Sequence, residues 1–217
     1  MNRSQHRSAL LKAYLRAGRL GEAEALFAKL QGQGFLGERV IFRHLIYRYG
    51  KKGRVQDAER IFRSIQTGGR TPDETEYGAF LSALARGGRP AQARALIEEM
   101  HAAGLRPNHI HLGTLVDSYA RVGNLEGAEE ALLLMQRAGF RPREVEYGTL
   151  LGAYCRARRL ADAERVLDRM IGAGVPLDSR HVSVMALAYE EAGHPERARA
   201  LRSQYAATLP TAMKRTD

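Results

Sequence analysis

Basic side chains recur along this chain at a fixed interval, and regularly spaced cations could hold a polyanion. The first series, with a step of 35 residues, comprises Arg16, Lys51, Arg86, Arg121 and Arg156 and ends at Glu191. The second, three residues further on, comprises Arg19, Arg54, Arg89 and Arg159, with Asn124 and His194 in the same column. Neutralising phosphates releases counterions, so such ladders favour a phosphate backbone. The alternative is local, because cations near the end of a helix complement its dipole.

The overall charge agrees with a polyanionic partner. The 217 residues contain 34 Lys and Arg against 24 Asp and Glu, for a net charge of +10 and a pI of about 10.1. A balance this basic favours nucleic acid as a partner. The alternative is that many arginines only solvate helix faces.

Other chemistries find little support in the sequence. The single cysteine, Cys155, excludes an intramolecular disulfide and a Cys-based zinc site, and we expect it to pack in the core. The histidines do not follow a metalloprotease spacing, and His109 and His111 are expected to be surface or capping residues. Neither a phosphate loop nor a Gly-x-Ser-x-Gly motif is present. We therefore expect no catalytic residues, metal or cofactor.

The sequence does not predict a membrane segment, since no apolar run approaches the 18 or so residues that a spanning helix needs. The first 20 residues are rich in Arg and free of acid, as in an organellar transit peptide. They also fit the first repeat in register, so we expect them to belong to the fold.

The elements that position the basic series are repeats of 35 residues. One column is always Ala: Ala23, Ala58, Ala93, Ala128, Ala163 and Ala198. A turn column reads Gly18, Gly53, Gly88, Gly123 and Gly193, with Arg158 as the exception. A closing glycine column reads Gly34, Gly69, Gly104, Gly139 and Gly174. A fixed period without insertions indicates a stacked repeat architecture.

Each repeat predicts two helices. In the third, Tyr77, Phe80, Leu81 and Leu84 form one apolar helical face, and Ala93, Leu96, Ile97 and Met100 form another. Gly87, Gly88 and Pro90 separate the two. One such hairpin cannot bury both of its faces, so neighbours must stack. We predict an all-α, right-handed α-solenoid of about six helix-turn-helix repeats as a single domain over 5–205, with repeats starting at 5, 40, 75, 110, 145 and 180 and a polar tail over 206–217.

The repeats resemble pentatricopeptide repeats over nearly the whole chain. The third reads TEYGAFLSALARGGRPAQARALIEEMHAAGLRPN and the fourth IHLGTLVDSYARVGNLEGAEEALLLMQRAGFRPR. The resemblance lies in the 35-residue step, the Gly-Arg turn, the Ala-rich second helix and the Gly-Leu-Arg-Pro-Asx ending. The tetratricopeptide repeat, with its 34-residue step and different pattern, does not fit.

The resemblance implies binding of single-stranded RNA in a groove of first helices, one nucleotide per repeat. It implies base-facing residues in the first helix at Ser8, Arg43, Gly78, Gly113, Gly148 and Ser183. It also implies base-facing residues that close the repeat, at Glu38, Asp73, Asn108, Arg143 and Asp178. Residues that pack on the base are Val40, Thr75, Ile110 and Val145, with Gln5 and Arg180 in the same column. The first basic series would face phosphate.

Three glycines depart from that family pattern, because Gly78, Gly113 and Gly148 have no side chain with which to read a base. Either the glycines let RNA or another helix approach the backbone, or the protein does not read sequence base by base. The closing residues also have a structural alternative: Asp73 with Glu76 forms an Asp-x-x-Glu capping pattern.

We therefore expect a non-catalytic RNA-binding adaptor that holds single-stranded or loop RNA in a basic concave groove. Its settings would be RNA processing, stability, translation or a ribonucleoprotein particle, with rRNA or mRNA as the RNA. The resemblance implies that the protein is located in a mitochondrion or plastid. If the chain natively begins at Met1, we expect a bacterial cytoplasm instead. The alternative is a protein–protein scaffold that holds an acidic peptide or a partner helix in the same groove.

Overall fold

The computed structural model describes residues 3–32 and 38–208, which form helices and their connecting turns. Gly34, the side chain of Gln5 and residues 209–217 of the predicted tail lie outside this description. The chain divides into two compact units, residues 1–118 and 119–217, and each is described by itself.

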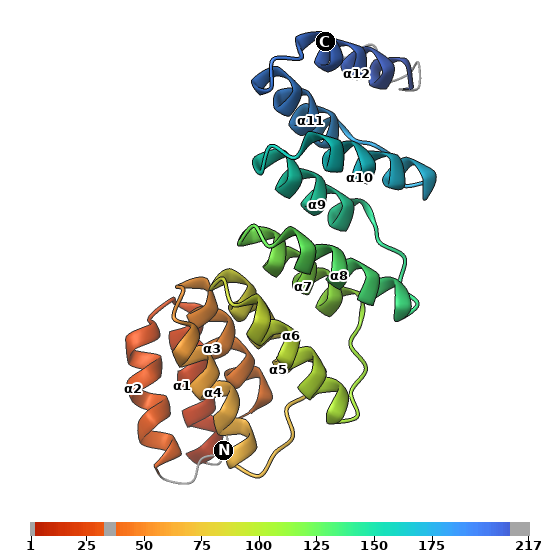
Figure 1. The fold of residues 1–217 in the computed structure, drawn as a ribbon. Coiled ribbons are helices and arrows are strands. Elements are labelled where there is room, and N and C mark those ends of the chain that lie inside the picture. The colour runs from red at the N-terminus through yellow and green to blue at the C-terminus, as the bar shows by residue number, and fades with distance from the viewer. Residues whose placement is uncertain (1–2, 33–37, 209–217) are drawn as a thin grey trace. The chain divides into compact units, whose positions relative to one another are not determined.

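The first unit contains three helical hairpins and the start of a fourth (Figure 1). They are α1 (Arg3–Arg16), α2 (Leu20–Gln31), α3 (Arg39–Lys51), α4 (Val55–Thr67), α5 (Glu74–Arg86), α6 (Pro90–Ala102) and the first part of α7 (His109–Arg121). Within this unit α3 packs against α1, α4 and α5, so first helices contact first helices.

The second unit repeats the arrangement. It contains the end of α7 and then α8 (Leu125–Arg137), α9 (Glu144–Arg156), α10 (Leu160–Gly172), α11 (Ser179–Glu191) and α12 (Pro195–Thr208). Here α9 packs against α8, α10 and α11. The predicted repeat starts fall within two residues of the starts of the first helices, and α12 continues to Thr208, three residues into the predicted tail.

The alanine column explains how closely the two helices of a hairpin approach. Each of its six members is completely buried. A side chain larger than a methyl group at these positions would push the helices apart, because protein interiors are close-packed. Larger apolar side chains complete the core: Leu11, Leu45, Phe62 and Leu81 in the first unit are at most 2 % exposed.

The turn between the two helices needs a left-handed residue. Gly53 and Gly123 have φ of 72° and 74°, and Arg158, the exception in the column, keeps the same conformation at 58°. The turn geometry therefore follows the repeat register even where glycine is absent. A side chain at positive φ costs roughly 1–2 kcal/mol, so Arg158 is a strained position.

None of the described helices combines the length and apolar character required to cross a bilayer.

Candidate functional site

The first basic column lies at the C-terminal ends of first helices. Arg16, Lys51, Arg86, Arg121 and Arg156 are the last residues of α1, α3, α5, α7 and α9, and all five are exposed. The sixth first helix, α11, ends at the exposed Glu191. The geometry fits a phosphate-facing role and the helix-dipole alternative equally well.

The charge of this column is largely uncompensated. Arg16, Lys51, Arg86 and Arg156 form no ion pair with any residue that the structure describes. A helix dipole alone favours a cation by only about 0.3–1 kcal/mol and leaves its donors exposed. These four side chains are therefore free to donate hydrogen bonds to an anion.

The second basic column is paired within the protein. Arg54, at the start of α4, bonds Asp57 at 2.7 Å and Glu24 of the preceding hairpin at 2.6 Å. Its guanidinium also lies 4.9 Å from the centre of the Tyr49 ring. The hydrogen bond to Asp57 is the main cause of a raised pKa for Arg54.

Arg19 and Arg159 repeat that arrangement. Arg19 bonds Glu22 at 2.7 Å, and Arg159 bonds Asp162 at 2.6 Å and Glu126 at 3.0 Å. Arg89 differs, since it forms no ion pair within the described part of the chain. Most of the arginines in this second column therefore form ion pairs with neighbouring carboxylates. The predicted contact of this column with phosphate stays a prediction.

The first-helix glycines have a structural partner in the next repeat. A Cβ atom added to Gly78 would lie 3.0 Å from Nε2 of His111, and one added to Gly148 would lie 2.7 Å from Nε2 of His181. Both imidazoles are buried, with 4 % and 5 % of the residue exposed. At these two positions glycine therefore makes room for a histidine rather than for a partner helix. Gly113 is half-buried in α7.

Three closing residues cap the helix that follows them. Oδ1 of Asp73 accepts from Glu76 N at 2.9 Å, and Asp178 and Asn108 accept from the corresponding nitrogens of His181 and His111. The third helical residue returns the bond: Glu76 Oε2 accepts from Asp73 N at 2.9 Å. These hydrogen bonds confirm the capping alternative for the three residues. Each cap uses the side-chain Oδ1 atom as an acceptor.

The other two closing residues are not capping side chains. Glu38 bonds Lys12 at 2.6 Å and also accepts a hydrogen bond from Ser8, and the Lys12 bond is the main cause of the lowered pKa of Glu38. The structure thus brings together Ser8 and Glu38, which are both expected to be base-facing, although Ser8 is buried. The side chain of Arg143 is exposed.

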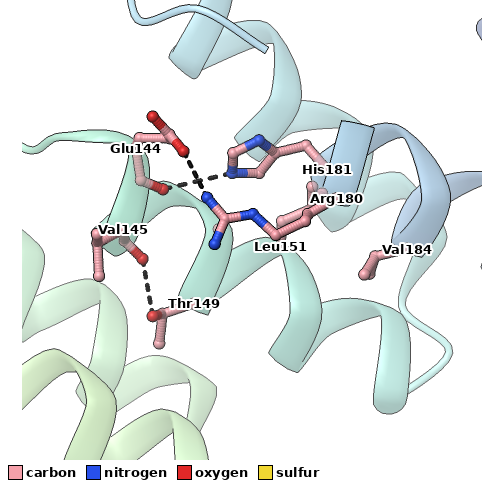
Figure 2. Close-up of a pocket in the computed structure, with 8 residues that line it drawn as sticks. Glu144, Val145, Thr149, Leu151, Arg180, His181 and Val184 are labelled. Atoms are coloured by element: carbon pink, nitrogen blue, oxygen red, sulfur yellow. Dashed lines mark hydrogen bonds and ion pairs between the residues drawn. The ribbon is translucent and has the colours of Figure 1, made fainter. Parts of the chain in front are cut away.

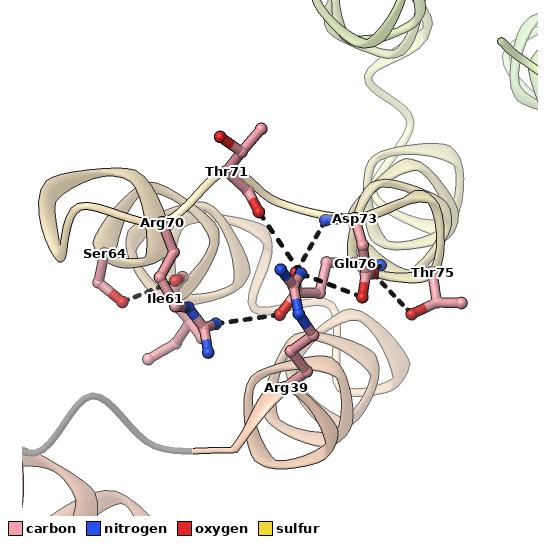
Figure 3. Close-up of polar contacts among 8 residues, drawn as sticks. All are labelled: Arg39, Ile61, Ser64, Arg70, Thr71, Asp73, Thr75 and Glu76. Atoms are coloured by element: carbon pink, nitrogen blue, oxygen red, sulfur yellow. Dashed lines mark hydrogen bonds and ion pairs between the residues drawn. The ribbon is translucent and has the colours of Figure 1, made fainter. Parts of the chain in front are cut away.

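A buried carboxylate joins two hairpins of the first unit (Figure 3). Glu76 is fully buried, and its oxygens lie 2.8 Å from Nη1 of Arg39 and 3.2 Å from Nη2 of Arg70. Arg39 also lies 3.1 Å from Oδ2 of Asp73. A charge removed from water needs such partners. Arg39 is therefore a structural residue, although it starts a first helix.

A pocket of about 290 Å³ opens between α9 and α11 in the second unit (Figure 2). Gly148 and His181 lie at its wall, together with the exposed Val145 and Val184. Arg180 bridges Glu144 and Asp178, both at 2.7 Å. The pocket thus brings together a predicted base-facing glycine and a predicted base-packing valine.

The remaining predicted residues differ in their exposure. Ile110 and Val145, which are predicted to pack on bases, are 73 % and 71 % exposed, whereas Val40 is half-buried. Thr75 is exposed and donates to Asp73 at 2.8 Å. Arg43 is half-buried, and Ser183 is exposed and donates to the backbone of Ser179 at 2.7 Å.

Cys155 and His111, which lie outside the basic columns, both have structural roles. Cys155 is buried, and burial raises the pKa of its thiol to about 11, which confirms a packing role. His111 is a capping residue, because its Nδ1 accepts from Asn108 N at 3.2 Å. The described residues contain no cluster of three or more His, Cys, Asp or Glu arranged for a metal.

Sequence reasoning missed a set of basic residues beside the first column. Lys12, Arg43, His44 and Arg48 lie on α1 and α3 near Arg16. Among them only Arg43 was predicted to face a ligand. The sequence did contain an indication, because neither helix contains an acidic residue.

Comparison with known families decides the identity of the repeats. The model of the pentacotripeptide-repeat region of PRORP matches residues 90–214, and the PPR repeat model matches residues 7–35 and 40–69. The chain belongs to the pentatricopeptide repeat family. Its predicted fold class, all-α and built from helix-turn-helix repeats, is thereby confirmed. No curated protein sequence matches this pentatricopeptide repeat chain.

Solved structures of pentatricopeptide repeat proteins share the fold. PPR10 from maize superimposes with a TM-score of 0.80 at 24 % identity, covering 91 % of this chain and 28 % of that one. PPR10 in complex with an 18-nt psaJ RNA element gives 0.74 at 23 % identity, covering 93 % and 30 %. The PPR domain of Arabidopsis thaliana protein-only RNase P 1 in complex with tRNA gives 0.70 at 17 % identity, covering 85 % and 99 %. The chain thus spans less than a third of PPR10.

Proposed function

We propose that this pentatricopeptide repeat chain binds single-stranded or loop RNA along its first helices. The observation that carries the proposal is the first basic column. Arg16, Lys51 and Arg86 end three first helices of the first unit, and Arg156 ends the first helix α9 of the second unit. All four are exposed and form no ion pair among the described residues. A repeating row of uncompensated cations suits a repeating polyanion.

The similar solved structures support RNA as that polyanion. One contains an 18-nt RNA element and another contains tRNA. The exposed aliphatic residues Ile110 and Val145 support contact with bases as well as phosphates, because bases exposed in single strands stack on or pack against protein side chains.

Base-by-base reading would be limited. The closing residues Asp73, Asn108 and Asp178 already use an acceptor for capping, and Gly78 and Gly148 provide no side chain. We therefore propose that phosphate contacts and packing supply most of the affinity. Discrimination among bases would be weaker.

The biological role that follows is a non-catalytic adaptor. Such a protein would protect or present an RNA during processing or translation, or sit on rRNA or mRNA within a ribonucleoprotein particle, in a mitochondrion, a plastid or a bacterium. The absence of recognisable catalytic motifs from the sequence supports this proposal.

A titration with three ligands tests the proposal. Purified protein is titrated with an unstructured RNA, the same sequence as a duplex, and an acidic peptide of equal charge, at one salt concentration. We expect the single strand to bind most tightly. Preference for the peptide, with RNA bound no better than any polyanion, would instead support a protein-interaction scaffold.

A further inference from the structure

The basic charge of the first helices is concentrated in the first two. α1 and α3 each contain four Lys or Arg and no Asp or Glu. The later first helices do contain acids: α5 and α9 each have two Glu in their first turn, and α11 ends in Glu190 and Glu191. Among the described first helices, α1 and α3 therefore carry the basic charge that is least opposed by acids in the same helix.

Helix geometry gathers these cations. Lys12 and Arg16 are one turn apart on α1, and His44 and Arg48 are one turn apart on α3. Arg43 precedes His44 on α3, and its charge contributes to the lowered pKa of that imidazole. The two helices pack against each other. Lys12, Arg43, His44 and Arg48 are half-buried, which limits how far the side chains can spread into solvent, while Arg16 is exposed.

Little negative charge opposes this cluster. Glu38 pairs with Lys12 at 2.6 Å. Arg16, Arg43 and Arg48 form no ion pair with any described residue. Like charges held close together without counterions repel one another, and an external anion relieves that repulsion.

The pKa of His44 depends on the charges of this cluster. Burial is the main cause of its lowered pKa, and the charges of Arg43, Arg48, Arg16 and Lys12 lower it further. All four named charges are positive, and they come both from α3 itself and from α1. The imidazole thus lies close enough to these four cations for their charges to lower its pKa.

We propose that Lys12, Arg16, Arg43, His44 and Arg48 form the densest phosphate site of the chain, which holds a run of consecutive phosphates of an RNA backbone. We call these five residues the α1–α3 basic surface. The inference rests on the proposed function and adds that one end of the chain dominates the electrostatic contact. Guanidinium groups suit this task because they can bond phosphate oxygens in pairs.

The test follows His44 directly. The His44 ring protons are followed by NMR across pH in the free protein and with saturating oligouridine. Phosphates beside the cations cancel their repulsion of the protonated imidazole, so RNA is expected to raise the pKa of His44. An unchanged His44 titration while RNA is bound would overturn the inference and leave the proposed function intact.

A pair of variants adds a second readout. Arg43→Gln with Arg48→Gln should make the negative slope of log affinity against log salt shallower by about 1.4, or about 0.7 per phosphate contact on a single strand. The matched control, Arg60→Gln with Arg94→Gln, removes the same charge from exposed positions on α4 and α6 and should keep the wild-type slope. Equal slopes for the two variants would overturn the inference.

The two failures are distinguishable. If wild-type protein does not bind oligouridine at low salt, the proposed function is wrong and the inference falls with it. If polyglutamate raises the pKa of His44 and oligouridine does not, the surface holds an acidic protein, and the RNA assignment is overturned. Circular dichroism of each variant checks that the helices remain folded.

Discussion

At the scale of single residues, the buried third residue of a first helix can restrict which residue fits at the contacting position of the preceding repeat. Glu76, His111, Glu146 and His181 occupy this position, and all four are buried. His181 bonds Asp178 at the start of its own helix and crowds Gly148 of the preceding repeat. The glycine column, which looks like missing base readers, is thus in part a packing requirement.

The contact between Gly148 and His181 predicts a non-additive pair. Gly148→Ala should destabilise the wild-type protein by about 1–2 kcal/mol, because the new methyl group overpacks against the imidazole. With His181→Ala present, the same change should stabilise by roughly 1 kcal/mol through helix propensity. Unfolding free energies from denaturant titrations measure the cycle, and equal effects of Gly148→Ala in both backgrounds would refute the contact.

Arg158 provides a second residue-scale prediction. Its φ of 58° belongs to the turn column that glycine otherwise fills. Arg158→Gly should raise the free energy of unfolding by about 1 kcal/mol, since it removes the left-handed strain. The neighbouring Ala157 has a φ of −79°, so Ala157→Gly is the matched control and should give no gain. A gain from both substitutions would contradict the explanation.

At the scale of elements, tyrosines at the ends of first helices connect one hairpin to the preceding one. Tyr189 Oη lies 2.8 Å from Glu164 of α10, and Arg197 of α12 lies 2.7 Å from the same carboxylate. Tyr154 and Arg169 share Glu129 in the same way. Burial, followed by the bond to Glu164, raises the pKa of Tyr189 to about 12.

This contact predicts a dependence of stability on alkaline pH. The pKa of Tyr189 is higher in the folded state than the ordinary value near 10, so the hydroxyl ionises first in the unfolded chain. The stabilisation is therefore complete below about pH 10 and is lost between about pH 10 and 12. Tyr189→Phe should cost about 1 kcal/mol at neutral pH and flatten part of the alkaline loss. Denaturant unfolding at several pH values measures both effects.

The control for this prediction is Tyr47→Phe, which removes an exposed hydroxyl from α3. It should leave the free energy of unfolding at neutral pH unchanged. If Tyr189→Phe and Tyr47→Phe lower that free energy equally, the Glu164 contact does not contribute to stability.

The elements were largely predictable from the sequence, and their side-chain partners were not. The 35-residue register placed each first helix within two residues of its observed start, and it identified Arg158 as the exceptional turn residue. It could not show that Arg54 bonds Glu24 of another hairpin, because periodicity fixes a column but not the direction of a side chain. The contact between His181 and Gly148 escaped for the same reason.

At the scale of the whole chain, the net charge of +10 indicates a polyanionic partner. This sum does not distinguish arginines that are paired with carboxylates from those that are not. The second basic column is mostly paired with carboxylates, whereas Arg16, Lys51, Arg86 and Arg156 of the first form no ion pair with a described residue. The α1–α3 basic surface adds a local excess that the total charge does not reveal. Position and pairing, rather than the sum of charges, therefore define the proposed RNA interface.

The most direct test of RNA binding along the first helices is the salt dependence of RNA affinity in two variants of equal charge. One variant replaces Arg16, Lys51, Arg86 and Arg156 with Gln, and the other replaces the exposed Arg60, Arg94, Arg165 and Arg199 of the second helices with Gln. We predict that only the first variant makes the negative slope of log affinity against log salt shallower, by about 2.8, or about 0.7 for each phosphate contact. Equal slopes in the two variants, or a wild-type slope in the first, would contradict the account.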